Sequence, residues 1–134
     1  MGFRYLLDTH IISDLARRPQ GPIAGKLVEV GPESVCTSLI VSCELRFGVK
    51  KNGSHKLHSQ IEAILEAVEI LPLDPPMEHE YAEIRVQLEG DGQPIGPNDL
   101  LIAAHARALG LTLVTDNSTE FRRVPGLAVE NWLE

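Results

Sequence analysis

The sequence has few cysteines and no long hydrophobic run. Cys36 and Cys43 are its only cysteines, and neither has a C-x-x-C companion or a nearby histidine at ligand spacing. This spacing argues against a zinc site, and we expect both to be reduced, buried small residues. No stretch approaches the roughly 18 apolar residues of a membrane helix. Because the N-terminus also lacks the pattern of a secretory signal, we expect a cytoplasmic protein without membrane contact.

The sequence is also short of positive charge. Its formal net charge is −7, which argues against a protein that coats nucleic acid by bulk attraction. A nucleic-acid substrate remains possible, because the first half has a local basic bias: Arg17, Arg18, Lys26, Arg46, Lys50, Lys51 and Lys56. The glycines form neither G-x-G-x-x-G nor G-x-x-x-x-G-K, so nucleotide-cofactor enzymes are not indicated.

What the sequence does contain is a regular alternation of strand-like and helix-like segments. Its 134 residues, 43% hydrophobic, suit one domain over residues 1–134. Strands are predicted at 4–8, 34–37, 68–71, 111–115 and 127–129. Helices are predicted at about 10–17, 22–30, 38–50, 55–67, 75–90, 98–109 and 117–121. The alternation predicts an α/β fold in which helices cover both faces of a central, mostly parallel sheet of about five strands.

Four carboxylates occupy special positions in this pattern. Asp8 and Asp116 end two strand-like runs, Asp99 begins the most apolar helix, and Glu44 lies about one turn into another helix. In open parallel sheets, ligands collect beyond the carboxyl ends of the strands, so the four acids can point at one volume. Carboxylates that converge beside buried side chains repel one another unless a cation is bound between them.

The ligand type predicts Mg²⁺ or Mn²⁺, because these hard cations prefer oxygen and accept phosphate oxygens. Phosphodiester hydrolysis is the natural use of such a site. Thr9 and Thr115, each beside an acid, are expected to orient the ligands. Taken singly, each acid also has a structural explanation: Asp8 as a helix cap, Asp99 as a helix-dipole partner, Glu44 as a solvated residue and Asp116 as a turn former.

Histidine-based sites are less well supported. His79-Glu80 begins like a zinc-protease motif, but the second histidine is missing. His55, His58 and Glu62 share a polar helix face that could bind surface zinc. His105 lies in the apolar helix and is expected to be a hydrogen-bonded core residue.

The sequence resembles the PIN domains, and more closely the VapC ribonuclease toxins of bacterial toxin–antitoxin pairs. The resemblance covers the whole chain and is carried by four ordered motifs, Leu6-Leu7-Asp8-Thr9, Ser42-Cys43-Glu44-Leu45, Ile95-Gly96-Pro97-Asn98-Asp99 and Val114-Thr115-Asp116-Asn117. The resemblance implies a PIN-like three-layer fold and a Mg²⁺- or Mn²⁺-dependent endoribonuclease. It also implies a homodimer, neutralised by a VapB-like antitoxin, that cuts structured RNA such as tRNA.

The resemblance also implies roles for individual residues. The acids matching Asp8, Glu44, Asp99 and Asp116 bind metal, and Thr9, His10, Thr115 and Asn117 lie beside them. Two departures stand out. The family commonly has Asn where this chain has His10, and close relatives often have Asn at position 116, so Asp116 is the ligand least supported by the resemblance.

Two other functional classes fit parts of the pattern. Asp8 could be the nucleophile of an aspartate-based phosphoryl-transfer enzyme, but such folds need a late lysine, and the last lysine here is Lys56. A PIN-like module that binds RNA or protein without catalysis is the other alternative. The presence of all four acids argues against it.

Overall fold

The computed structural model describes residues 2–134. Over these residues, five strands form one parallel sheet in the order β3-β2-β1-β4-β5. The strands are β1 (Tyr5–Leu7), β2 (Val35–Ser38), β3 (Glu69–Leu71), β4 (Thr112–Val114) and β5 (Val129–Glu130). The sheet is thus parallel throughout. The strand predicted at 127–129 begins two residues later.

The helices lie close to their predicted positions. They are α1 (Thr9–Arg17), α2 (Pro22–Val30), α3 (Leu39–Asn52), α4 (His55–Ala67), α5 (Met77–Gly90), α6 (Pro97–Leu109) and α7 (Ser118–Phe121), with an unpredicted 3₁₀ turn at Pro32–Ser34. The Ser38 hydroxyl caps α3 by accepting a hydrogen bond from the Ile40 N–H. The α3 helix continues two residues beyond the predicted end and stops at Gly53, which adopts the left-handed conformation.

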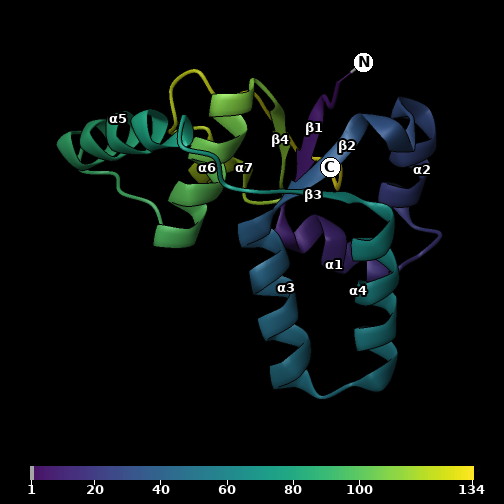
Figure 1. Ribbon diagram of the computed structural model, residues 1–134. Coiled ribbons are helices and arrows are strands. Elements are labelled where there is room, and N and C mark those ends of the chain that lie inside the picture. The colour runs from purple at the N-terminus through teal and green to yellow at the C-terminus, as the bar shows by residue number, and fades with distance from the viewer. Residues whose placement is uncertain (1) are drawn as a thin grey trace.

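Right-handed crossovers explain how the helices divide between the two faces of the sheet. The chain moves outward in one direction from β1 to β3 and then returns across the sheet to β4, so the later helices lie on the opposite face. Figure 1 shows α6 and α7 on one side of the strands and α1, α2 and α4 on the other. The strand order reverses between β1 and β4, and their carboxyl ends face the end of the molecule where α3 and α4 project.

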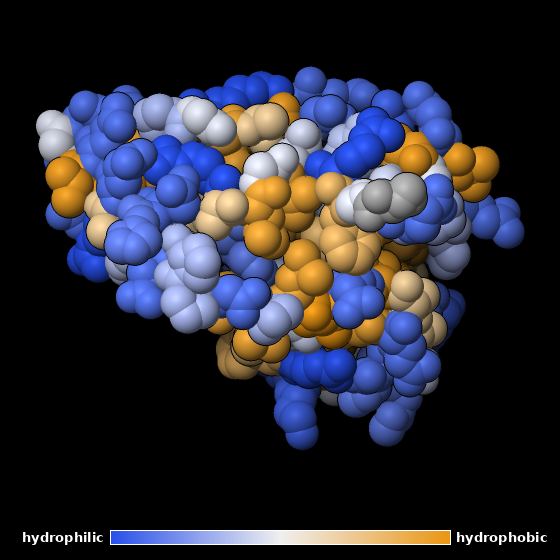
Figure 2. Space-filling view, turned by 45° about the horizontal axis from the view of Figure 1, so that its top comes forward, coloured by the Kyte–Doolittle hydropathy of each residue, from blue (hydrophilic) through white to orange (hydrophobic). Residues whose placement is uncertain are grey.

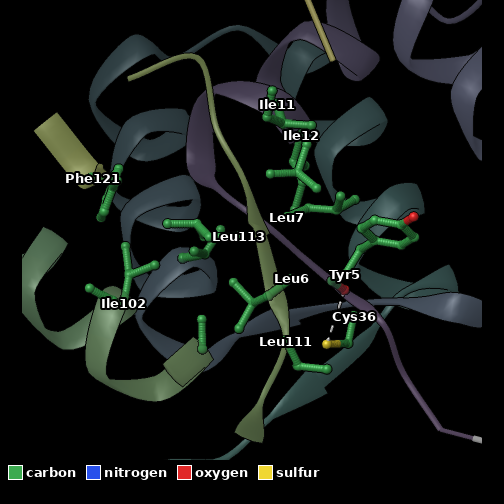
Figure 3. Close-up of a cluster of buried hydrophobic side chains, with 14 of the residues drawn as sticks. Tyr5, Leu6, Leu7, Ile11, Ile12, Cys36, Ile102, Leu111, Leu113 and Phe121 are labelled. Carbon is green, nitrogen blue, oxygen red and sulfur yellow. Dashed lines mark hydrogen bonds between the residues drawn. The ribbon is translucent and has the colours of Figure 1, made fainter. Parts of the chain in front are cut away.

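The core is built on β1, whose three residues are all buried. Leu6 and Leu7 have no exposed surface, and they pack among Ile11, Ile12, Ile102, Leu113 and Phe121 (Figure 3). The Cys36 thiol donates a hydrogen bond to the Tyr5 carbonyl, and burial raises the pKa of this thiol to about 12. The prediction of a buried, unreactive cysteine is therefore confirmed for Cys36.

The same prediction is wrong for Cys43, which is exposed on α3. The periodicity of the helix explains this, because its buried side is formed by Val41, Ser42, Leu45 and Val49. Cys43 lies between these positions and faces away from the core. None of the helices described in residues 2–134 is long and apolar enough to cross a membrane.

Candidate active site

Asp8 lies at the point where the strand order reverses. It follows β1, and its N–H donates to the Val114 carbonyl at the end of the neighbouring strand β4. The side chain is buried, and it caps α1 by accepting from the Thr9 N–H at 2.8 Å. Its other carboxylate oxygen accepts from the Thr115 hydroxyl at 2.7 Å. Asp8 is therefore both a helix cap and an acid in the crevice where open α/β sheets bind ligands.

Glu44 reaches the same edge of the sheet from α3. One carboxylate oxygen accepts from the Thr9 hydroxyl, and the other accepts from the Asn98 amide at 3.3 Å. The partners of this side chain come from α1 and α6, so Glu44 joins three helices at the carboxyl ends of the strands. It does not behave as a freely solvated helix residue.

Asp99 lies in the first turn of α6 and is the most electrostatically perturbed acid of the group. Burial raises the pKa of the Asp99 carboxyl to about 6, and the negative charges of Asp8, Glu120 and Glu44 add to the shift. Burial likewise raises the pKa of Asp8, against the opposing effect of the hydrogen bonds from Thr115 and Thr9. Asp8, Glu44 and Asp99 thus lie near enough to repel one another.

Asp116 is placed differently from the other three predicted acids. Its side chain is partly exposed, and a carboxylate oxygen lies 3.2 Å from Nδ1 of His10. Asp116 is not among the charges that raise the pKa values of Asp8 and Asp99. The structure therefore brings three of the four predicted acids together and directs the fourth toward His10.

Glu120 is a further acid near Asp99, although it was not among the predicted ligands. It lies on α7, and its carboxylate accepts from the Asn117 amide at 2.9 Å and from the Gly96 N–H at 3.4 Å. The Asn117 and Glu120 side chains bond to each other, and the Asn117 side chain caps no backbone N–H of α7. This geometry turns Glu120 toward Asp99.

Sequence reasoning did not identify Glu120 or Asn98 as site residues. Both stand beside residues that it did identify, Glu120 at the start of the helix after β4 and Asn98 next to Asp99. Their positions at the starts of helices could have identified both residues. In a parallel sheet, the first turns of the helices that follow the strands lie together at one edge. By contrast, the residues expected beside the acids are each bonded to a carboxylate: Thr9 to Glu44, His10 to Asp116, Thr115 to Asp8 and Asn117 to Glu120.

The chemistry of this group suits a hard divalent cation. The acids supply only oxygen donors. The pKa values of Asp8 and Asp99 are raised mainly by burial and also by neighbouring carboxylates, whose charge a cation would neutralise. Within residues 2–134, no three acidic, histidine or cysteine side chains are already drawn together as a metal-binding group. The hydrogen bonds from Thr9 and Asn98 hold the Glu44 carboxylate in place at this edge of the sheet.

The histidines considered as metal ligands lie outside this site. His105 is buried, and its Nδ1 lies 2.8 Å from the Ser38 hydroxyl, so the prediction of a hydrogen-bonded core histidine is confirmed. His58 and Glu62 lie 4.0 Å apart, while the Glu62 carboxylate is engaged by Arg46. The described residues around them form no group able to hold zinc.

The sequence model of the PIN domain matches residues 5–127 of this chain. Ribonuclease VapC2 of Rickettsia felis is 37% identical over 130 residues, which are 96% of this chain and 97% of that protein. The tRNA(fMet)-specific endonuclease VapC of Shigella flexneri is 31% identical over 96% of this chain and 98% of its own. This chain is a PIN-domain protein of the VapC ribonuclease family.

Solved structures of VapC proteins share its fold. The VapBC2 complex of Rickettsia felis bound to promoter DNA contains a chain that superimposes with a TM-score of 0.88, at 36% identity, and covers 98% of this chain and 99% of its own. The FitAcB structure from Neisseria gonorrhoeae gives a TM-score of 0.84 at 34% identity, covering 97% and 99% of the two chains. The predicted PIN-like three-layer α/β/α fold is therefore confirmed.

Proposed function

We propose that this protein is a metal-dependent endoribonuclease toxin of a VapBC module. The observation that carries the proposal is the group of Asp8, Glu44 and Asp99 at the reversal point of the sheet, where burial and mutual repulsion raise the pKa of Asp99 to about 6. These three acids, with Glu120 and Asp116 at the margin, would hold Mg²⁺ or Mn²⁺. The ion would polarise the phosphodiester and lower the pKa of the attacking water.

The protein's own residues prepare this site. Thr115 fixes the Asp8 carboxylate, and Thr9 and Asn98 fix that of Glu44. The acids are therefore oriented by groups from α1, from α6 and from the residue that follows β4. A late lysine to meet a phosphoryl group on Asp8 is absent from the sequence, which disfavours the phosphoryl-transfer alternative. The similarity to proteins named as ribonucleases disfavours a non-catalytic module.

The direct test is RNA cleavage by the purified protein with Mg²⁺ or Mn²⁺. We expect Asp8→Ala and Asp99→Asn each to abolish cleavage while far-UV circular dichroism stays that of the wild type. Asp91→Asn is the matched control, because Asp91 is exposed at the C-terminus of α5, outside the site. Full activity of either active-site variant, or full activity in EDTA, would contradict the proposal.

The partner and substrate follow from the relatives. Several solved relatives are toxin–antitoxin complexes, and we infer that a VapB-like antitoxin binds this chain. A groove of about 230 Å³ runs from Glu44 and His10 between α1, α3 and α4, past Arg17 and Asn52, and offers that antitoxin a route over the acids. We expect a homodimer that cleaves structured RNA such as tRNA in the cytoplasm. Sequencing new RNA 5′ ends after brief expression without antitoxin would identify the target.

A further inference from the structure

We propose that the outward face of α3 beyond Glu44 binds the RNA substrate, with Phe47 stacking on an unpaired base and Lys51 contacting a phosphate. This inference rests on the proposed ribonuclease function and adds to it the path of the substrate away from the acids.

The first support is the order of residues along α3. Glu44, Phe47 and Lys51 are spaced i, i+3 and i+7, so they lie on one face of the helix. Seven residues of α-helix advance about 10 Å, so the face extends from the carboxylate over a length that suits successive nucleotides of one strand. The α3–α4 hairpin projects from the sheet on the side of the strand ends (Figure 1), and Phe47 and Lys51 are both exposed on it.

The second support is the exposure of Phe47. Its exposed fraction is 67%, whereas every other aromatic residue described in the chain is buried or half-buried. A partner that covers so large an apolar ring would be favourable, because it removes apolar surface from water. Aromatic rings that stand clear of the protein surface are the usual stacking platforms for unpaired bases.

The third support is charge. The Lys51 ammonium lies 5.8 Å from the centre of the Phe47 ring, and Lys50 and Lys56 are exposed at the same end of the hairpin. None of these three lysines has a carboxylate partner within residues 2–134, whereas Arg46, earlier on the same helix, is paired with Glu62. Figure 2 shows hydrophilic residues at the foot of the molecule, where this hairpin ends. In a chain of net charge −7, the group of Lys50, Lys51 and Lys56 is therefore a local positive surface that phosphates can contact.

The combination favours RNA over a protein partner. Charged residues, lysine among them, are depleted from the cores of protein interfaces, yet here the Lys51 ammonium lies 5.8 Å from the centre of the exposed ring. An aromatic ring beside unpaired lysines, in line with a phosphodiester-cleaving site, has the features of a single-strand binding surface.

The test measures RNA affinity without cleavage. All variants carry Asp99→Asn, and fluorescence anisotropy reports binding of a fluorescein-labelled RNA stem-loop and of the fully paired duplex of the same stem. We expect Phe47→Ala to weaken stem-loop binding about 10-fold, within the range for loss of one stacked base, and to leave duplex binding unchanged. Phe47→Trp should restore the affinity. Val86→Ala on α5 is the matched control, because Val86 is an equally exposed apolar residue, 73% exposed, and should have no effect.

Lysine variants provide an independent readout. We expect Lys51→Ala to reduce the slope of log affinity against log salt by about 1, as the loss of one phosphate contact requires. Lys26→Ala on α2 should leave the slope unchanged. Stem-loop affinity unchanged in both Phe47→Ala and Lys51→Ala would overturn the inference. If Phe47→Ala instead abolishes self-association or antitoxin binding with RNA affinity intact, the face is a protein interface and the inference is wrong. Either result leaves metal-dependent cleavage by the wild type, and hence the proposed function, intact.

Discussion

The Thr115 hydroxyl is the contact that holds Asp8 in place from a distant part of the chain. It is buried and donates to Asp8 at 2.7 Å. Replacing Thr115 with valine keeps the volume of the side chain but leaves a carboxylate oxygen of the buried Asp8 without this donor. We expect Thr115→Val to weaken Mn²⁺ binding, measured by calorimetry, about 10-fold or more, the usual effect of losing a group that orients a ligand.

Thr112 supplies the matched control for this prediction. It lies on β4, the strand that immediately precedes Thr115, and its side chain makes no hydrogen bond described in residues 2–134. Thr112→Val should therefore leave Mn²⁺ affinity within about twofold of the wild type. Equal loss in both variants would show that the effect comes from the strand and not from the Asp8 contact.

Asp99 makes the stability of the metal-free protein depend on pH. Its pKa rises from 3.8 to about 6 on folding, mainly through burial, so the folded state binds its proton more tightly than the unfolded state. The stabilisation from this proton is complete below pH 3.8 and is lost as the pH rises through 6. Since Asp99 is only partly buried, we expect Asp99→Asn to raise the free energy of unfolding by about 1–2 kcal/mol at pH 7.

Urea unfolding in EDTA tests whether Asp99→Asn raises the free energy of unfolding. The advantage of Asp99→Asn over the wild type should narrow as the pH falls from 7 to 4, because the wild-type carboxyl becomes protonated in the folded state. Asp91→Asn should show no such trend. An Asn variant less stable than the wild type at pH 7 would contradict the repulsion inferred among Asp8, Glu44 and Asp99.

At the scale of elements, replacing each of two helix glycines with alanine should change the stability of the protein in opposite directions. Gly53 ends α3 with φ at +74°, where a Cβ is unfavourable, although the site is sterically open. Gly25 lies inside α2, and a Cβ added there would have no neighbouring atom within 4 Å. We expect Gly53→Ala to lower the free energy of unfolding by about 1 kcal/mol and Gly25→Ala to raise it by about 0.5–1 kcal/mol. Thermal unfolding of both variants measures the difference.

Elements were predictable from sequence because local signals determine them. Ser38 marks the start of α3, the left-handed Gly110 ends α6, and uninterrupted apolar runs mark the buried strands. The orientation of side chains at the site was less predictable. Asp116 turns toward His10 and Glu120 turns inward because of contacts between α1, α6 and α7, which no local pattern encodes. Cys43 was misplaced because one hydrophobic residue in a mixed helix does not reveal which side is buried.

At the scale of the whole molecule, Arg107 ties three segments together. Its side chain, only 12% exposed, donates to Glu80 and Glu83 on α5 and to the Pro125 carbonyl near the C-terminus. Arg107→Ala should lower the free energy of unfolding by about 2–3 kcal/mol, because it removes a mostly buried side chain and leaves the partly buried Glu80 carboxylate without this donor. Arg85→Ala removes only an exposed pair with Glu89 on the same helix and should cost less than about 0.5 kcal/mol. Urea unfolding compares the two variants.

The hydrogen bond between Asp8 and Thr115 joins residues 107 positions apart. During synthesis, the N-terminal half of the chain therefore emerges with Asp8 and Glu44, but without the first turn of α6 and without β4 and Thr115, which hold these two acids in place. Closing so long a loop is entropically costly until β4 can pair with β1. A ribosome that is still translating this chain carries an incomplete enzyme, so the cell's RNA is exposed to the nuclease only after nearly the whole protein has been made.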